Sequence, residues 1–240
     1  MIIGDSIIDE YIYTDTLGKS AKESILATLK KNEQIFAGGS IAAANNISDF
    51  CKNVFLVTTI GSSSKKHENF IKNQLSPNIK LCSTRLKNRP TTKKTRFVDS
   101  SYMRKMFEVY DMDDSPIDKS DEKKIISAIN KNLPLVDLII ITDFGHGLLN
   151  EKIIEIISKS KTFLAINAQT NSANRGYNLI TKYKSADYIC IDEPEFRLAM
   201  HDKNTPLKQL LLSSQNLPKS KVFIVTTGKN GCLIKIKNEI

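Results

Sequence analysis

Carboxylates and glycines follow several apolar stretches of this 240-residue chain, at positions where they could bind a polar ligand. Asp5 follows Gly4 after a short apolar start, and Asp9 lies four residues further along. A carboxylate at a strand end can accept hydrogen bonds from substrate hydroxyls, and a glycine lets the backbone approach a ligand closely. The same residues also suit a turn or a helix cap, so both interpretations stay open for this first group.

A glycine pair forms the second group. Gly38 and Gly39 directly precede a helical pattern that begins at Ser40. Free backbone N–H groups and the positive end of a helix dipole at such a turn suit a polar or anionic ligand. Glycine pairs before helices are also common without a ligand, so this group gains meaning only together with the others.

The third group is the run ITDFGHG, which follows the most apolar stretch of the chain. Asp143 could bind substrate or metal there, or it could cap the next helix. His146 is a single histidine with no carboxylate or cysteine visible beside it in the sequence. We therefore interpret it as a surface or loop histidine and not as a catalytic base.

The fourth group contains Asp192 and Glu195, which stand one helical turn apart around Pro194. Proline and acidic residues are favoured in the first turn of a helix, so capping alone explains this cluster. The functional alternative is a site for Mg²⁺ or its water shell beside phosphates, because magnesium binds oxygen ligands and keeps several waters.

The fifth group is a turn after the last apolar run, with Thr226, Gly228 and Gly231 as its main members. Its glycines permit close approach to a phosphate, although an ordinary hairpin would use the same residues. No GxxxxGK[ST] motif occurs, and no GxGxxG follows the first strand. The sequence thus argues against P-loop nucleotidases and ordinary dinucleotide dehydrogenases.

The elements that must position these groups alternate between strand-like and helical periods. Several strand-like runs are apolar on both faces, which is typical of parallel strands covered by helices on both sides. We predict an α/β fold with a doubly wound, mostly parallel sheet. The clearest predicted strands are residues 54–60, 136–141, 162–166, 188–191 and 222–226. The predicted helices are residues 40–50, 67–74, 122–132, 151–158, 193–201 and 207–213.

Two stretches, at about residues 9–34 and 91–111, break this alternation because they contain β-type segments without a convincing crossover helix. They predict a small antiparallel appendage. Such a flap could cover a ligand site and exclude water, or it could be a decorative hairpin. The acidic segment at 111–121 predicts a surface connection.

Composition limits the classes of function. The chain carries 35 Lys and Arg against 26 Asp and Glu, a net charge of +9, but the basic residues are scattered and no aromatic residues alternate with them. This argues against a nucleic-acid partner. No segment is apolar enough to span a membrane and no secretory signal opens the chain, so a cytoplasmic location is expected. The four cysteines are far apart and are expected to be small core residues.

Taken in order, these groups resemble the PfkB/ribokinase family of carbohydrate kinases. The opening GDSIIDEYIY is similar to that of the heptose-phosphate kinase branch, the kinase domain of ADP-heptose synthases. The resemblance continues through AGGSIAAANNI, RPTTKKTRFV, MRKMFE and ITDFGHG, so it covers essentially the whole chain. It implies one ribokinase-like kinase domain over residues 1–240, with the two β-type stretches forming a lid.

The resemblance also implies roles for individual residues. Asp5, Asp9, Gly38, Gly39 and Asn46 match positions that line the sugar pocket. Asp192 and Glu195 match the Asn-x-x-Glu motif that organises Mg²⁺ and phosphate, with aspartate in place of asparagine. Thr226, Gly228 and Gly231 match the strand and turn that approach ATP.

Three departures from the family pattern affect what can be expected. Ala42 replaces an asparagine, and His146 replaces a lysine. The Gly-Ala-Gly-Asp element, which binds the transferred phosphoryl group and supplies the base, has no match in residues 1–240. The resemblance therefore implies a C-terminally incomplete domain whose base lies beyond Ile240, with almost no kinase activity in this chain. Asp143 as a substitute base would still lack the anion-binding N–H groups.

The expected function is ATP-dependent phosphorylation of a sugar or sugar phosphate in nucleotide-sugar precursor synthesis. The resemblance implies a nucleotidyltransferase partner or a missing second half, and a homodimer formed through the lid strands. The alternatives are a non-catalytic domain that binds a sugar phosphate or nucleotide, and an interaction module that uses the lid for dimerisation.

Overall fold

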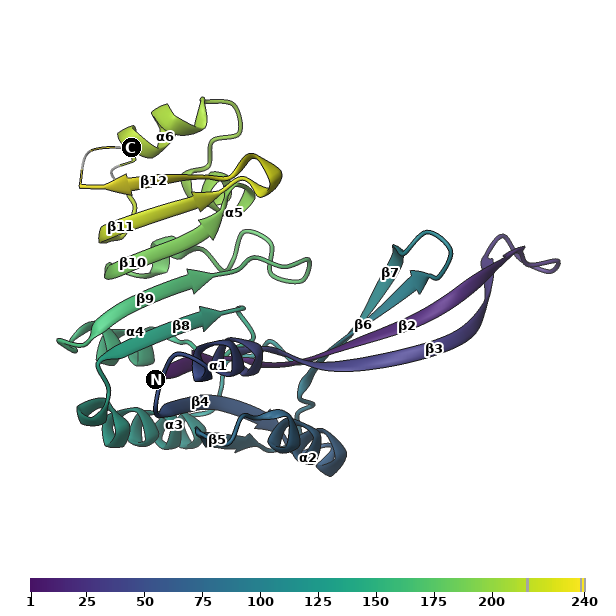
Figure 1. Ribbon diagram of the computed structural model, residues 1–240, viewed down its shortest axis with the longest axis horizontal. Helices are drawn as coiled ribbons and strands as arrows, with labels where there is room; N and C mark the ends of the chain where they lie inside the picture. Colours follow the sequence, from purple (N-terminus) through teal and green to yellow (C-terminus); the bar gives the residue numbers. More distant parts are fainter. Residues whose placement is uncertain (215, 238, 240) are drawn as a thin grey trace.

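The main sheet confirms the predicted α/β class. The computed structural model describes residues 1–214, 216–237 and 239. Eight strands form one sheet in the order β12-β11-β10-β9-β8-β1-β4-β5, and only β12 runs antiparallel to its neighbour (Figure 1). The strands are β1 (Ile2–Gly4), β4 (Val54–Gly61), β5 (Ile79–Leu86), β8 (Leu138–Asp143), β9 (Phe163–Ala168), β10 (Ser185–Asp192), β11 (Lys219–Thr226) and β12 (Cys232–Ile236).

All six predicted helices are present close to their predicted bounds. They are α1 (Ser40–Ser48), α2 (Lys65–Gln74), α3 (Lys119–Asn132), α4 (Glu151–Ser158), α5 (Glu193–Met200) and α6 (Leu207–Ser213). The five predicted strands are also confirmed, as β4 and β8–β11. The outer strands β5 and β12 were not predicted, because their residues alternate between apolar and polar types and several of them are exposed.

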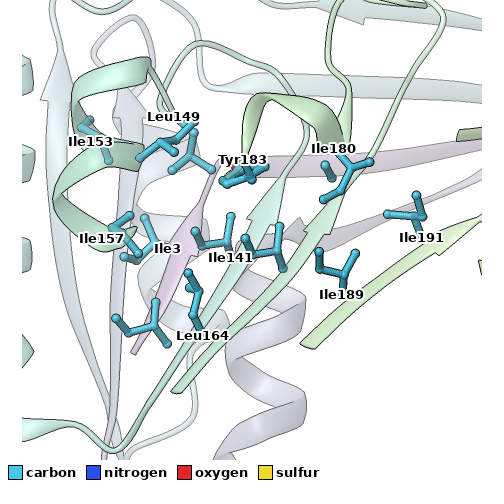
Figure 2. Packing of buried hydrophobic residues seen from close by; sticks show 14 of the residues in the cluster. Ile3, Ile141, Leu149, Ile153, Ile157, Leu164, Ile180, Tyr183, Ile189 and Ile191 are labelled. Atoms are coloured by element: carbon cyan, nitrogen blue, oxygen red, sulfur yellow. The ribbon is translucent and has the colours of Figure 1, made fainter. Parts of the chain in front are cut away.

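Two apolar clusters cover the two faces of this sheet. Residues of α3, α4, α5 and α6 pack on one face against strand residues such as Ile3 and Ile141. Figure 2 shows part of this cluster, where Ile157 of α4 lies beside Ile3. On the other face, α1 and α2 pack against the alternate strand residue Ile2. Burial on both faces explains why these strands read as continuous apolar runs.

The lid is a separate four-stranded sheet that extends away from the main sheet (Figure 1). It consists of β2 (Ser6–Lys19), β3 (Leu26–Gly39), β6 (Thr92–Asp99) and β7 (Arg104–Asp111). Strands β2 and β3 pair antiparallel, and so do β6 and β7, as predicted. The sequence did not predict that the two hairpins join through parallel pairing of β2 with β6.

Two predictions about composition can be compared with the structure. No helix within the described residues is long and apolar enough to cross a membrane. The prediction that the cysteines are core residues was wrong for Cys232, which is exposed, and holds only in part for Cys51, Cys82 and Cys190, which are partly buried. Cys51 and Cys82 pack against the two apolar clusters.

Candidate functional site

Four of the five predicted groups lie at the carboxyl ends of parallel strands in the main sheet. Asp5 follows β1, Asp143 ends β8, Asp192 ends β10 and Thr226 ends β11. Asp192 and Thr226 are direct neighbours in the strand register. Because parallel strands end at a common edge, this edge is where an open α/β sheet binds ligands.

Asp5 joins the main sheet to the lid, since β1 ends at Gly4 and β2 begins at Ser6. Its side chain is 2% exposed. The carboxylate accepts hydrogen bonds from the backbone N–H groups of His146 (3.3 Å) and Leu148 (3.4 Å). Burial raises the pKa of Asp5. Through these hydrogen bonds, Asp5 positions the loop after β8.

Asp143 is the centre of a buried polar cluster and is 1% exposed. One carboxylate oxygen accepts from the Gly145 N–H (3.0 Å) and the Asn178 amide (3.2 Å). The other accepts from the Tyr183 hydroxyl and lies 2.5 Å from the Lys182 ammonium. Burial, followed by the Asp143 charge, raises the pKa of Tyr183 well above its usual value. Four donors therefore surround Asp143, which fits a structural role.

His146 lies in the loop after β8, as one of the two predicted alternatives, but it is not at the surface. It is 5% exposed, and its Nδ1 lies 2.7 Å from the Asp114 carboxylate. Within the described part of the chain, its Nε2 is buried without a hydrogen-bond partner. Asp114 lies in the acidic segment that we interpreted only as a surface connection, 32 residues upstream. The partner was therefore present in the sequence, but no local pattern linked the two residues.

One face of the lid carries a row of charged and aromatic side chains. Asp9 of β2, Lys94 of β6 and Tyr110 of β7 are register partners across three strands. In the next row on this face, the Arg96 guanidinium bonds to Asp9 and to Glu108 (3.2 Å). The sequence motif RPTTKKTRFV contained Lys94 and Arg96, but it did not show that their side chains share a face with Asp9.

The glycine pair borders this charged row. A Cβ atom on Gly38 would lie 2.0 Å from an Asp9 carboxylate oxygen, so only glycine leaves space for that carboxylate. Gly39 has φ of 60°, and the next N–H, of Ser40, donates to the Asp5 carbonyl (3.0 Å). The pair therefore fixes the turn from the lid into α1 and shapes the space beside Asp9.

Asn46 does not join this group. It is exposed on α1, six residues after the first helical residue, Ser40. At a rise of about 1.5 Å per residue, this places it about 9 Å along the helix from the glycine turn. The structure thus brings Asp9 and the two glycines together, and places Asn46 apart from them.

A cleft of about 930 Å³ lies beyond the ends of β9 and β10. Asp192 and Glu195 line it and form the predicted cap of α5: Asp192 accepts from the Glu195 N–H (2.7 Å), and Glu195 accepts from the Asp192 N–H (3.0 Å). Glu195 also accepts from the Thr170 N–H (3.0 Å). Burial is the main cause that raises the pKa of Glu195 to about 7.

The same cleft contains cationic side chains that the sequence did not identify, Arg175 and Lys203. Arg175 is exposed on the loop after β9. Asparagines anchor this loop: Asn171 and Asn174 both donate to the Phe144 carbonyl (3.0 and 2.9 Å). The cleft therefore combines carboxylates at the start of α5 with the cations Lys203 and Arg175, of which Arg175 lies on the anchored loop, and this suits a charged ligand.

The fifth group forms a tight hairpin between β11 and β12. Gly228 and Gly231 have φ of 60° and 90°, which glycine adopts without strain. The Thr227 N–H and hydroxyl both bond to the Gly231 carbonyl (2.8 and 2.9 Å). The turn is thus an ordered hairpin at the same edge of the sheet as Asp192.

Comparison with known proteins identifies the family. The sequence profile of the pfkB family carbohydrate kinases matches residues 1–240. The chain belongs to this family. It is 25% identical over 244 residues to the bifunctional protein HldE of Aliarcobacter butzleri, which covers 99% of this chain and 50% of that protein. It is 27% identical over 258 residues to HldE of Helicobacter acinonychis, covering 100% and 51%. The chain thus spans about half the length of these relatives.

Solved structures agree on the fold. Phosphofructokinase-2 from Escherichia coli, in complex with substrates and products, has a TM-score of 0.71 at 12% identity, covering 99% of this chain and 76% of that chain. Ribokinase from Arabidopsis thaliana, complexed with ribose and ATP, has a TM-score of 0.68 at 14% identity, covering 100% and 75%. The main sheet with its lid is therefore the ribokinase-like fold.

Proposed function

We propose that this domain takes part in ATP-dependent phosphoryl transfer to a sugar or sugar phosphate of the heptose-phosphate type. The observation that carries the proposal is the charged lid face beside the carboxyl edge of a ribokinase-like sheet. Its carboxylate Asp9 can accept hydrogen bonds from sugar hydroxyls, and Gly38 keeps the neighbouring space open. Membership of the carbohydrate kinase family and the likeness to HldE proteins support this assignment.

In this proposal the substrates occupy two parts of one edge. The sugar lies between the lid face and the Gly38–Gly39 turn, and Asp5 acts indirectly by holding the loop after β8. ATP lies toward β10 and β11, where Thr226, Gly228 and Gly231 offer backbone to its phosphates. The cleft at the ends of β9 and β10 has the size and charge for part of that nucleotide.

A magnesium ion would fit at Asp192. Its second carboxylate oxygen has no hydrogen bond within the described residues and the side chain is exposed, whereas both Glu195 oxygens already accept backbone N–H groups. Residues 1–214, 216–237 and 239 contain no cluster of three or more metal-ligating side chains. Magnesium does not need such a cluster, because it is commonly bound by one carboxylate together with water molecules and substrate phosphates. When bound, the ion would neutralise phosphate charge.

The chemistry also requires a base that orients the acceptor hydroxyl. Asp143 is unsuited to this role, because four donors already surround its carboxylate. We assign no base among the described residues. The second candidate function is a domain that binds a sugar phosphate or nucleotide without catalysis, for which the charged lid face and the cleft at Asp192 would suffice.

Two partners belong to the proposal. Exposed apolar side chains on the lid, among them Phe107 and Val109 at 52% each, would suit pairing of two lids in a homodimer. The likeness to HldE proteins, named as bifunctional and about twice as long, supports a second half such as a nucleotidyltransferase.

The proposal is tested by measuring binding and turnover together. We expect isothermal calorimetry to show saturable binding of sedoheptulose or mannose phosphate esters, and Asp9→Ala to weaken it by about tenfold or more through loss of a charged hydrogen-bond acceptor. Magnesium-dependent transfer from ATP would support the kinase. Binding without transfer would support the non-catalytic alternative, and the absence of binding to any sugar phosphate or nucleotide would contradict both.

A further inference from the structure

One face of the main sheet is covered by helices over only half of its width. On the side of α1 and α2, the apolar cluster reaches from β4 and β5 as far as Ile140 of β8. On the opposite side, helices α3 to α6 pack on residues that include Ile166, Ile189 and Phe223 of β9, β10 and β11. The strands from β9 to β12 are therefore covered on one side and not on the other, as far as the described residues show.

The uncovered side carries two apolar rows that cross the strands. Seven residues make up this open face, and none of them belongs to either apolar cluster: Ala165, Tyr188, Cys190, Val222, Ile224, Ile234 and Ile236. The strand register aligns Tyr188 with Ala165 and Val222, and it aligns Ile224 with Cys190 and Ile234. Ile234 and Ile236 are 42% and 52% exposed, and the other five are partly exposed.

An open face of this kind is unusual for parallel strands. The strands β9, β10 and β11 pair in parallel, and parallel sheets occur almost only with both faces covered. A contiguous apolar surface that remains in contact with water indicates a site where another polypeptide packs. The open face therefore requires a covering layer.

The covered half of the same side indicates what kind of layer fits. There, Ile41 and Ala44 of α1 pack on strand residues such as Leu56. The surface continues without a step into the open face, because Ile140 of the covered half is the register partner of Ala165. A helix placed beside α1 would extend a helical layer that already exists.

The dimensions of the open face match one or two helices. Four strands about 4.8 Å apart span about 14 Å, and packed helices lie about 8 to 10 Å apart. The eight residues of β10 extend over about 26 Å, which is the length of a helix of about 17 residues. Solved structures of this fold contain additional chain, because residues 1–240 cover only 76% of phosphofructokinase-2 and 75% of the ribokinase.

We propose that the open face is the docking surface for one or two amphipathic helices that the described residues do not supply. Their apolar side packs on Tyr188, Ile224 and Ile234, and their polar side faces solvent. The open face is assigned from the fold alone, so it is independent of the proposed function.

Peptide binding tests the proposal. Overlapping peptides of about 30 residues, each long enough for one such helix, are made from the parts of the Aliarcobacter butzleri and Helicobacter acinonychis HldE proteins that lie outside their matches to this chain. Fluorescence anisotropy measures their binding to residues 1–240, and circular dichroism measures their helicity. We expect at least one peptide to bind saturably and to become helical on binding, because isolated helices of this length are marginal in water.

Two cysteines report where a peptide binds. Cys190 belongs to the open face, and Cys232 lies at its edge as the register partner of Thr226. A bound helix should slow the reaction of both thiols with iodoacetamide by about tenfold, since the rate depends on access to the sulfur. Cys51 and Cys82 pack against the two apolar clusters and are the internal controls, whose rates should stay within about twofold.

A pair of substitutions gives a second measurement. Ile234→Asp should weaken peptide binding by about tenfold or more, because it places a charge in the apolar contact. The matched control is Leu212→Asp on α6, which replaces a similarly exposed side chain (47%) on the opposite side of the sheet and should leave affinity within about twofold. Both substituted side chains are exposed, so the midpoints of thermal unfolding should change little.

Three outcomes would overturn the proposal. One is that no peptide binds, and another is that a bound peptide leaves Cys190 and Cys232 as reactive as before. The third is that light scattering shows a dimer of residues 1–240 that Ile234→Asp dissociates, because a second copy would then cover the open face in place of helices. Sugar-phosphate binding is measured separately, so the proposed function is unaffected by any of these results.

Discussion

Two polar regions at the same end of the molecule differ in how completely their charges are satisfied. Around Asp143, four donors from the loop, Asn178, Lys182 and Tyr183 converge on one carboxylate. On the lid face, among the residues that the structure describes, Asp9 pairs with the single cation Arg96, and Lys94 has no carboxylate in contact. Asp143 and Lys94 are both buried, at 1% and 6% exposure, so burial alone does not distinguish the two residues.

The number of hydrogen-bond partners that a charged group has within the protein helps to distinguish structural polar groups from ligand-binding ones. Burying charge is tolerated where every donor and acceptor finds a partner within the protein. The Asp143 cluster meets this condition and joins the loops after β8 and β9. On the lid face, Asp9, Lys94 and Arg96 place charges of both signs side by side, and such an arrangement suits a polar ligand.

The largest expected effect is on stability at the saturated cluster. Asp143→Ala would leave the Lys182 ammonium and the buried Tyr183 hydroxyl without their shared acceptor, and we expect it to lower the free energy of unfolding by about 3 to 5 kcal/mol. Urea denaturation measures this. Asp15→Ala, which breaks the exposed pair with Lys31, is the control and should cost less than about 1 kcal/mol. A loss below about 1 kcal/mol for Asp143→Ala would break the comparison.

The next effect is on binding at the unsaturated lid face. The Cβ atom of Gly38→Ala would displace the Asp9 carboxylate from its pairing with Arg96. We expect sugar-phosphate affinity to fall about tenfold while stability changes by less than about 1 kcal/mol. Calorimetry in a double-mutant cycle sharpens the test: in an Asp9→Ala background, Gly38→Ala should have almost no further effect. Equal losses in both backgrounds would show that Gly38 acts independently of Asp9.

The smallest expected effect is on the pH dependence of stability and concerns Glu195. Both of its carboxylate oxygens accept backbone N–H groups, and the side chain lines the cleft. Its pKa of about 7 lies above the ordinary value of 4.5. The folded state thus favours the protonated form, and the stabilisation is complete below about pH 4.5 and is lost as the pH rises through 7. We expect the stability difference between the unaltered protein and Glu195→Gln to decrease by on the order of 1 kcal/mol between pH 5 and 8, since the adjoining cleft moderates the charge.

Chemical denaturation at a series of pH values measures that difference, and the exposed Glu155→Gln is its control. A difference that stays constant between pH 5 and 8 would mean that Glu195 does not titrate in this range. Glu195 would then be an ordinary capping carboxylate, and hydrogen-bond saturation would not be enough to distinguish structural from ligand-binding carboxylates.

The sequence predicted the main sheet well because its strands are buried on both faces and their apolar runs are unbroken. The helix cap formed by Asp192 and Glu195 was also predicted from the sequence, because the two residues lie only three positions apart. Alternating edge strands such as β5 carry a weaker signal. Pairings between distant segments, including the parallel join of β2 with β6, have no local signature at all.

The candidate site was predictable only in part for the same reason. Asp9 and Gly38 were identified as separate groups, but their contact depends on the pairing of β2 with β3. The burial of His146 and its contact with Asp114 were not predicted, because Asp114 comes from the connection after the lid. Lys94 drew attention only as a member of a motif. Its position between Asp9 and Tyr110 exists only in the folded arrangement of three strands.

The single residue between β1 and β2 has a mechanical consequence. Asp5 links a strand at the centre of the main sheet to a long lid strand, and its carbonyl holds the Ser40 N–H at the start of α1. The lid is therefore coupled directly to the core of the main sheet. A ligand that restricts the motion of the lid would also reduce the backbone motion of α1 and of the loop after β8.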